Sequence, residues 1–334
     1  MNFILLAFLD RCPARGWRQK FHKSHKKKMD ILIEGLTKTY GTQKAVDNIS
    51  FEVHTGEIVG FLGPNGAGKT TTMKMITQFI SPDSGNITIG GKTIARNNIR
   101  GSIGYLPENN PLYEDMPVMD YLSFCGQLQG IRKDRLQERV REMVVMCGLN
   151  EEKHKKIGEL SKGYRQRVGL AQAMIHDPAI LILDEPTTGL DPNQRVEIRE
   201  LIKRLGAHKS VILSTHILPE VEATCDRILI INKGKIVANG TPETLRSQAS
   251  GKSILLVDIE GAPRNQVEQV LRQMPGITGV GLSADHRLLE VECTDSQQTA
   301  RAVYKTCVAK DWMLLQMSPV ETRLEDIFRN VTMN

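Results

Sequence analysis

The 334-residue sequence is poor in aromatic residues, which make up 5% of the chain, and its six cysteines include no CxxC pair. Zinc sites and disulfide scaffolds need cysteines at short spacings, so neither is expected, and a reducing cytoplasm is the predicted compartment. The balance of 40% hydrophobic and 25% charged residues excludes disordered, collagen-like, mucin-like and coiled-coil proteins. Most of the chain is therefore expected to be globular and soluble.

A long hydrophobic run is also missing. The one candidate, residues 1–9, is much shorter than the roughly 20 residues of a membrane helix, and its basic residues follow it, unlike those of a signal peptide. Residues 1–28 contain eight Lys or Arg and one acid, which gives them a net charge of +7. The whole chain has a net charge of +6, so residues 29–334 sum to −1. We interpret residues 1–29 as a basic extension outside the fold; the alternative is a tail that binds membrane or nucleic acid.

The length and the local patterns predict two domains. Residues 30–246 alternate short β-rich runs with helical segments, as in a layered α/β domain with a largely parallel sheet. Residues 247–252 are typical of a linker. Residues 253–334 follow the order strand, helix, strand, strand, helix, strand and end in a short helix. This order predicts a small α+β accessory domain of the split βαββαβ, ferredoxin-like type.

Two uninterrupted apolar runs predict the centre of the first domain's sheet. They are Ile180–Leu183 and Ile228–Ile231, and a strand with one wet face would alternate apolar and polar residues instead. A more helical insert is expected at about 117–174, where apolar residues such as Leu136 and Val140 recur at helical spacing. These apolar positions are expected to lie in the core.

The most informative stretch directly follows the apolar run Ile58–Leu62. It fits the pattern GxxxxGK[ST] and consists of Gly63, Pro64, Asn65, Gly66, Ala67, Gly68, Lys69 and Thr70, followed by Thr71. Glycines permit backbone angles that turn successive N–H groups toward phosphate oxygens, and the next helix adds its positive N-terminal end. We predict that Lys69 reaches the β- and γ-phosphates and that the Thr70 hydroxyl lies where Mg²⁺ binds.

A second acidic motif ends the buried run Ile180–Leu183. Asp184 and Glu185 follow it directly, which predicts two carboxylates at the same sheet edge as the phosphate loop. In P-loop enzymes an Asp at this position holds Mg²⁺, and a following Glu is suitably placed to polarise the attacking water. An ordinary acidic turn is the competing interpretation, and the phosphate loop argues against it.

These motifs together resemble the ATP-binding cassette (ABC) ATPases, a P-loop NTPase family with a mixed sheet and a helical subdomain. Leu160–Arg167 resembles the family's signature sequence, which places Ser161 and Gly163 beside a helix start. Gly189–Pro192, which includes Asp191, resembles the loop that crosses between two cassettes. The resemblance covers about 30–240, with the motifs in the family's order.

The resemblance also gives a role to two residues that alone would more often be structural. His216, at the end of Ser214-Thr215-His216, matches the family's switch histidine, which contacts the γ-phosphate. Tyr40, just before Gly41, matches the aromatic residue on which adenine stacks. Glu185 and His216 are thus the expected catalytic residues.

The sequence departs from the family pattern in two motifs. Ile103–Glu108 resembles the loop that couples nucleotide to transporter, yet Glu108 stands where the family usually has Gln; its carboxylate could still approach Mg²⁺. The signature has Lys162, Tyr164 and Arg165 in place of the middle of LSGGQ. These variants look similar to ATPase subunits of bacterial exporters, including those associated with gliding motility.

The resemblance implies a homodimer that clamps two ATP molecules, because the phosphate loop supplies donors from one side only. Ser161, Gly163 and Asp191 of one copy would then face the nucleotide held by Lys69 of the other, with ATP and Mg²⁺ as cofactors. It further implies a separately encoded membrane permease as partner, and a peripheral location on the cytoplasmic face of the cell membrane.

Other functions remain open at this point. A soluble ABC ATPase acting on ribosomes or DNA is the main alternative, although such proteins often carry two cassettes or a coiled-coil insertion, and the near-neutral folded part gives no reason to expect nucleic acid. A plain nucleotide-binding regulator would leave the carboxylate, signature and histidine motifs unused.

Overall fold

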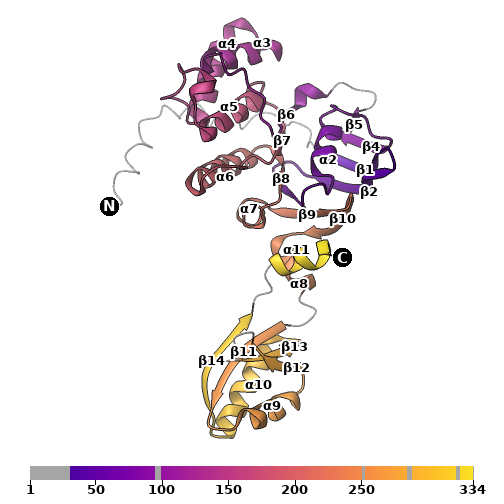
Figure 1. The fold of residues 1–334 in the computed structure, drawn as a ribbon, viewed down its shortest axis with the longest axis vertical. Coiled ribbons are helices and arrows are strands. Elements are labelled where there is room, and N and C mark those ends of the chain that lie inside the picture. The colour runs from indigo at the N-terminus through magenta and orange to yellow at the C-terminus, as the bar shows by residue number, and fades with distance from the viewer. Residues whose placement is uncertain (1–30, 95–98, 250–252, 284–287, 321–323, 334) are drawn as a thin grey trace.

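The computed structural model describes residues 31–94, 99–249, 253–283, 288–320 and 324–333. The predicted basic extension, residues 1–29, lies outside this part of the chain. The described elements form two regions, which Figure 1 shows at opposite ends of the long axis: a larger one built from the first two sheets and their helices, and a smaller one built from the third sheet.

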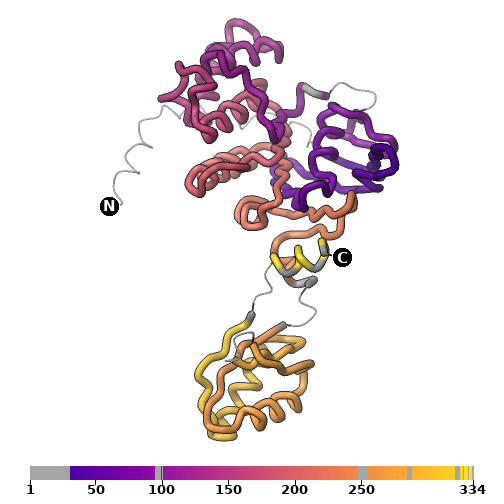
Figure 2. Tube along the Cα trace, in the orientation of Figure 1, coloured from indigo at the N-terminus to yellow at the C-terminus, as the bar shows by residue number. Residues whose placement is uncertain are grey.

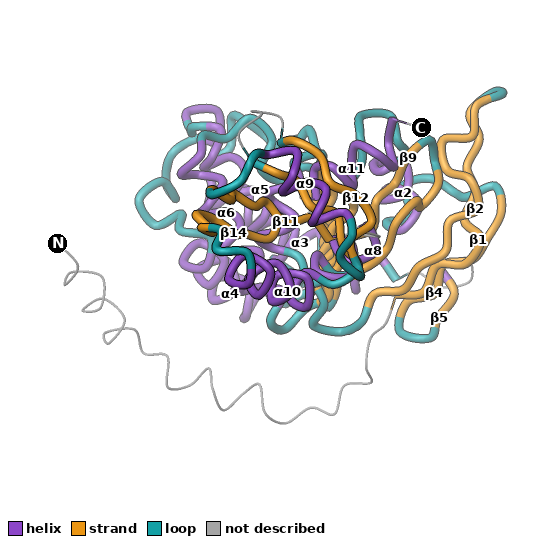
Figure 3. The backbone as a smooth tube through the Cα atoms, turned by 90° about the horizontal axis from the view of Figure 1, so that it is seen from below, coloured by secondary structure: helices purple, strands orange, loops and turns teal. Residues whose placement is uncertain are grey.

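The larger region contains an antiparallel sheet and a mostly parallel sheet. The antiparallel sheet lies at one side of the molecule (Figure 3), and its strands in order are β2 (Gln43–Val53), β1 (Ile31–Tyr40), β4 (Ser84–Ile89) and β5 (Lys92–Thr93). The second sheet has six strands, in the order β10 (Lys235–Gly240), β9 (Arg227–Asn232), β3 (Ile58–Leu62), β8 (Ser210–Thr215), β7 (Ile180–Asp184) and β6 (Ile103–Leu106). Only β10 runs antiparallel to its neighbour, so the expected mixed sheet is confirmed.

The central strands contain long apolar runs because each side of the sheet is covered by a separate core. Along β7, Leu181 and Leu183 enter one core, while Ile180 and Ile182 enter the other. Successive side chains of a strand point to opposite faces, so a strand buried on both sides needs apolar residues at every position. Ile228–Ile231 in β9 alternates between the two cores in the same way.

Helices cover the parallel sheet; α2 packs into the core that contains Ile180 and Ile182, and the other helices extend the core that contains Leu181 and Leu183, which we call the first core. They are α2 (Lys69–Ile76), α3 (Val118–Leu128), α4 (Lys133–Met146), α5 (Lys162–Met174), α6 (Pro192–Gly206), α7 (Leu218–Thr224) and α8 (Pro242–Ala249), with 3-10 turns η3 (Arg100–Ser102) and η4 (Ile157–Glu159). Helices α3, α4 and α5 lie within the predicted insert at 117–174. Leu122 and Val140 from these helices belong to the same core as Leu181 of the sheet.

The smaller region has the predicted ferredoxin-like arrangement. Its elements in chain order are β11 (Ser253–Glu260), α9 (Arg264–Arg272), β12 (Ile277–Leu282), β13 (Leu289–Cys293), α10 (Ser296–Ala309) and β14 (Met313–Val320). The sheet order is β12-β13-β11-β14 with all neighbours antiparallel, and a third core including Val257, Val291 and Val303 lies between sheet and helices. We call residues 253–320 the ferredoxin-like unit.

Two features differ from the sequence-based division of the chain. Helix α8 extends to Ala249, so the first half of the predicted 247–252 linker is helical. The last helix, α11 (Leu324–Met333), lies beside α8 rather than in the ferredoxin-like unit (Figures 1 and 2), with Leu324 and Ile327 in the first core. The apolar residues of α11 recur at helical spacing, which predicts a helix with one buried face. This local pattern does not indicate which of the two regions that face packs against.

Candidate nucleotide site

The phosphate loop joins β3 to α2 and uses its glycines for backbone conformation and for close packing. Gly66 and Gly68 have φ angles of 79° and 107°, which side-chain-bearing residues rarely adopt. A Cβ atom on Gly68 would lie 2.3 Å from the carbonyl oxygen of Ala45, and one on Gly63 would lie 2.5 Å from that of Ile231. The loop is thus held against the neighbouring strands, with Asn65 and Gly66 exposed at its tip.

The Lys69 side chain folds back over this loop. Only 6% of the residue is exposed, and its Nζ donates to the carbonyl oxygens of Gly63 at 2.8 Å and Pro64 at 3.2 Å. The same ammonium lies 3.6 Å from Oε1 of Glu185. The positive charge therefore faces the space enclosed by the loop and the acidic motif, where phosphate oxygens are its natural ligands.

Asp184 ends strand β7 and is fully buried. Ser214 on β8 donates its hydroxyl to Oδ1, whereas Oδ2 has no hydrogen-bond partner among the described residues. Burial raises the pKa of Asp184, and the hydroxyls of Ser214 and Thr70 oppose that shift. An orphaned carboxylate oxygen beside a hydroxyl is a pair of hard ligands, which fits Mg²⁺.

The residues near Asp184 fit a magnesium ion that is held mainly by its nucleotide. Mg²⁺ commonly takes one or two protein ligands together with phosphate oxygens and water. The described residues contain no group of three or more His, Cys, Asp and Glu side chains arranged to hold a metal on its own. Thr70 and Asp184 are the residues that would hold the ion, whose charge would offset that of the phosphates.

Asp184→Asn is expected to stabilise the nucleotide-free protein, because it removes a buried charge. A carboxyl pKa raised by folding means that the stability falls as the pH rises through the range where the group ionises. Removing the buried charge should add about 1 kcal/mol to the free energy of unfolding at pH 7, and less at pH 4, because the raised pKa increases the protonated share of the wild-type carboxyl as the pH falls. Thermal unfolding at both pH values, with exposed Asp115→Asn as control, measures this; a lower Tm at pH 7 would contradict it.

Glu185 is held in a strained backbone conformation by neighbours on three sides. Its φ is 51°, which is uncommon for a residue with a side chain. Its N–H donates to the carbonyl oxygen of Ser214 at 3.0 Å, and Thr188 donates its hydroxyl to Oε2 at 3.0 Å. Nδ1 of His216 lies 2.9 Å from both carboxylate oxygens. The predicted catalytic pair is thus in direct contact.

The signature segment forms the start of α5, where it contacts α6 of the same chain. Ser161 caps α5 by accepting from the N–H of Tyr164, and Asp191 caps α6 by accepting from the N–H of Gln194. A Cβ atom on Gly163 would lie 2.7 Å from the side chain of Gln194. The start of α5 and the start of α6 therefore lie side by side. No described contact joins either helix start to Lys69.

Tyr40 and Glu108 are both exposed. Tyr40 ends β1 with 52% of its surface accessible, and Nζ of Lys38 lies 5.9 Å from its ring centroid. Glu108 lies in the turn after β6, and burial together with the charges of Asp184 and Glu108 raises the pKa of Tyr105. No described contact joins Glu108 to Thr70 or Asp184, so its predicted role as a magnesium ligand stays a prediction.

Several polar residues of the site were not expected from the sequence. Ser214 bonds Asp184, Thr188 bonds Glu185, and the buried Glu220 accepts from the hydroxyls of Thr187 and Thr215. The position of Ser214 could have been found from the sheet rule, because it ends a strand adjacent to β7 at the same carboxyl edge. Nothing in the local sequence pattern distinguishes Glu220 from an exposed helix acid.

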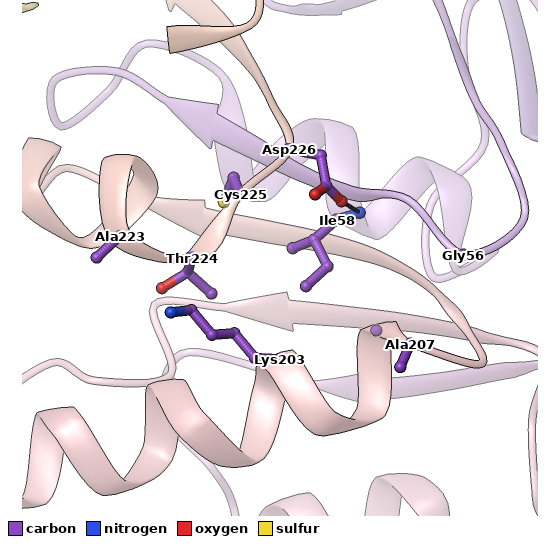
Figure 4. A pocket seen from close by; sticks show the side chains of 9 residues that line it. Gly56, Ile58, Lys203, Ala207, Ala223, Thr224, Cys225 and Asp226 are labelled. Carbon is purple, nitrogen blue, oxygen red and sulfur yellow. Dashed lines mark hydrogen bonds between the residues drawn. The ribbon is translucent and has the colours of Figure 1, made fainter.

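A groove of about 370 Å³ lies at the other edge of the sheet. Figure 4 shows Lys203, Thr224 and Asp226 around it, with Asp226 accepting from the N–H of Ile58 at 2.8 Å. Ile58 begins β3, whereas the phosphate loop follows the end of that strand. Ligands of open α/β sheets bind at the carboxyl ends of the strands, so this groove is separate from the nucleotide site.

The fold and the gathered motifs define a P-loop nucleotide-binding domain. The ABC transporter family matches residues 46–188. The chain is 36% identical over 301 residues to the uncharacterised ABC transporter ATP-binding protein YxlF of Bacillus subtilis, covering 90% of this chain and 99% of that protein. It is 34% identical over 306 residues to the linearmycin resistance ATP-binding protein LnrL of the same bacterium, with 90% and 98% covered.

Solved structures share the fold. The structure of an ATP-binding subunit of an ABC transporter has a TM-score of 0.60 at 31% identity, covering 66% of this chain and 92% of that chain. A dimeric ATP-binding cassette bound to ADP and Pi has a TM-score of 0.59 at 24% identity, covering 63% of this chain and 98% of that one. The chain therefore belongs to the ABC transporter ATP-binding proteins, and its larger region is an ABC ATPase domain.

Two observations concern the rest of the chain. In the part that the structure describes, no helix combines the length and the apolar composition required to cross a membrane. The described cysteines are buried and unpaired, and burial raises the pKa of Cys147 to about 12, which leaves its thiol protonated and unreactive. Cys12 lies outside the described residues.

Proposed function

We propose that this protein is the ATP-hydrolysing subunit of an exporter and drives a separately encoded membrane permease. The observation that supports hydrolysis best is the meeting of four side chains at one sheet edge. Lys69 lies 3.6 Å from Glu185, which contacts His216 at 2.9 Å, and Asp184 lies beside Glu185 with one free buried oxygen. A site that only bound nucleotide would not need a carboxylate and an imidazole in contact.

Each side chain has a proposed task in hydrolysis. The loop N–H groups and the α2 N-terminus bind the phosphates, and Lys69 turns from the Gly63 carbonyl to the β- and γ-phosphates. The Glu185 carboxylate orients the attacking water and accepts its proton. His216 donates a hydrogen bond to the γ-phosphate oxygen, and its contact with Glu185 fixes the orientation of both groups. Thr70 and Asp184 would hold magnesium, with Glu108 as a further proposed ligand, and the ion would supply positive charge to neutralise the phosphates.

We propose that two copies of the chain enclose the nucleotide between them. The phosphate loop and the acidic motif come from one sheet edge, so they leave the opposite side of a bound triphosphate open to water. The paired starts of α5 and α6 carry Ser161, Gly163 and Asp191, and a helix start is an anion-binding surface. Provided by a second copy, this surface would complete the site. The exposed Tyr40 ring is the proposed platform for adenine.

The proposed permease contact lies near Glu108 and the helical insert. Tyr113, which is 59% exposed, contacts the rings of Tyr121 and Phe124, and Phe124 is also exposed. Neighbouring Asn110 donates to the carbonyl oxygen of Arg165 in α5 at 2.9 Å. This turn therefore joins an exposed aromatic surface to the helix that begins with the signature, so a partner bound there could sense closure of the site.

The export role is proposed from the relatives. They are named for linearmycin resistance, for daunorubicin resistance in Streptomyces coeruleorubidus and for Nod factor export in Rhizobium. The predicted similarity to gliding-motility subunits stays a prediction, and so does the location on the cytoplasmic face of the cell membrane.

Co-expression with a membrane protein encoded beside this chain tests the proposal. The expected result is a complex that survives detergent purification and hydrolyses ATP faster than the isolated subunit does. Variants of Tyr113 should weaken the complex without lowering the basal hydrolysis. Recovery with ribosomes or DNA in place of the membrane protein would favour a soluble ABC ATPase instead.

We propose that the ferredoxin-like unit strengthens association of the two copies. Ile254 near the start of the unit pairs directly with Val320 at its end, so the two ends of residues 253–320 lie next to each other. Replacement of 253–320 by a short Gly/Ser linker should therefore keep the Tm of the ATPase domain. It should weaken ATP-dependent dimerisation, measured by light scattering, and unchanged association would contradict the role.

Deletion of 252–334 is expected to act differently from that replacement. This deletion also removes Leu324 and Ile327 from the first core, which should cost about 2–5 kcal/mol of unfolding free energy. Thermal unfolding of the two variants side by side separates loss of the unit from loss of α11. Equal Tm values would contradict the packing of α11 on the ATPase domain.

A further inference from the structure

Glu220 on helix α7 is a buried acidic residue that the proposed mechanism does not use. It is 3% exposed, and its Oε2 accepts two hydrogen bonds, from the hydroxyl of Thr187 at 2.6 Å and from that of Thr215 at 3.1 Å. Its Oε1 is buried and has no hydrogen-bond partner among the described residues. Thr187 and Thr215 are buried as well.

The two hydroxyl donors come from the two segments that carry the catalytic pair. Thr187 lies two residues after Glu185, in the turn that follows β7, and Thr215 directly precedes His216 at the end of β8. Glu220 is therefore a single acceptor shared by both segments. Thr215 also accepts from the N–H of Ile217, so its hydroxyl is fixed from both sides.

The turn after β7 needs such an anchor. Glu185 has a φ of 51°, and a strained conformation of this kind persists only where the surrounding structure holds it. The hydrogen bond from Thr187 to Glu220 is a second restraint on that turn, in addition to the backbone hydrogen bond from Glu185 to Ser214. Without it, the turn could relax and move the Glu185 carboxylate relative to the imidazole.

Stability alone is a poor reason to keep an acid at this position. Burying a carboxyl group that leaves one oxygen unpaired costs free energy, and apolar residues at positions 187, 215 and 220 together would avoid that cost. A buried acid that carries such a cost is expected where its hydrogen bonds hold neighbouring groups in a required geometry.

We propose that Glu220 is a positioning residue for ATP hydrolysis, which sets the placement of Glu185 against His216 by holding Thr187 and Thr215 on one oxygen. In this role Glu220 acts through Thr187 and Thr215 rather than by contact with the nucleotide. The consequence is specific: loss of the shared acceptor lowers turnover and leaves the affinity for ATP unchanged. The proposal rests on the proposed roles of Glu185 and His216.

The test compares three variants of the purified full chain in steady-state ATP hydrolysis. Glu220→Leu fills the space but removes the acceptor, and kcat should fall about 10- to 100-fold with KM for ATP within twofold of wild type. Glu220→Gln keeps an acceptor oxygen in the same place and should retain at least half of the wild-type kcat. Glu222→Leu, two residues further along α7 where the acid bonds Arg246, is the matched control and should leave kcat unchanged.

Thermal unfolding of the same variants separates positioning from a structural role. Glu220→Leu removes a buried acid but leaves the buried hydroxyls of Thr187 and Thr215 without their acceptor, so the two effects on Tm oppose each other and the variant should remain folded at the assay temperature. A wild-type kcat in Glu220→Leu, or a loss in Glu220→Gln as large as that in Glu220→Leu, would overturn the proposal. If Glu220→Leu does not fold, the double variant Thr187→Val with Thr215→Val takes its place, and a normal kcat there overturns the proposal equally.

A Glu185→Gln sample in the same assay shows which assignment has failed. If Glu185→Gln keeps its turnover, the proposed catalytic roles are wrong. If Glu185→Gln is inactive and Glu220→Leu is normal, only the positioning role is wrong. Thr187→Val should have no further effect when added to Glu220→Leu, because the bond is already absent.

Discussion

Glu185→Gln is expected to lower kcat for ATP hydrolysis about 100- to 1,000-fold while ATP still binds. The amide keeps the size and one acceptor of the carboxylate but cannot take a proton from water, and general base catalysis contributes about this factor. The phosphate loop, Lys69 and Thr70 remain in place, and the amide also removes a negative charge 3.6 Å from Nζ of Lys69. Binding should therefore be at least as tight as in the wild type.

The same variant should accumulate as an ATP-bound dimer. Hydrolysis reopens the proposed sandwich, so a chain that binds but does not hydrolyse remains closed. Phosphate release and size-exclusion chromatography with Mg²⁺ and ATP measure the two effects, with Glu200→Gln on the exposed side of α6 as control. Near-normal turnover would refute the role of Glu185, and a monomer under saturating ATP would refute the sandwich.

Lys69→Ala is expected to weaken ATP binding about 100-fold. The ammonium is the positive side chain that the structure places over the loop, and a charge-assisted bond to phosphate is lost with it. The loop itself should survive, because its conformation rests on Gly66 and Gly68 and on contacts with Ala45 and Ile231. The defect is therefore expected in affinity rather than in folding.

Calorimetric titration with ATP measures the affinity of Lys69→Ala, and thermal unfolding without nucleotide checks its fold. Lys74→Ala is the matched control, since Lys74 lies on the same helix and is exposed. A dissociation constant within threefold of wild type would show that Lys69 does not meet the phosphates.

The sequence predicted the parts of this fold that depend on short-range patterns. Runs such as Ile180–Leu183 predict central strands, since a strand covered on both faces needs apolar side chains at consecutive positions. The ferredoxin-like order followed from the alternation of strand and helix, and the phosphate loop from its glycines beside Lys69. In each case the residues that carry the pattern are neighbours in the chain.

Features that join distant segments were not predictable in this way. The contact between Glu185 and His216 spans 31 residues, and the family resemblance assigned both roles without giving the distance. The shared acceptor Glu220 depends on two hydroxyls, one in the turn after β7 and one at the end of β8, which only the sheet order brings together. The docking of Leu324 on the first core depends on where the ferredoxin-like unit returns the chain.

Because α11 packs on the ATPase domain, the core of that domain is completed late in synthesis. Leu324 and Ile327 cover part of a core whose other members are made long before, so a nascent chain that ends within the ferredoxin-like unit leaves that patch uncovered. At about 5–20 residues per second, the ribosome needs several seconds to make this unit. During that interval the ATPase domain is expected to expose apolar surface that α11 later covers.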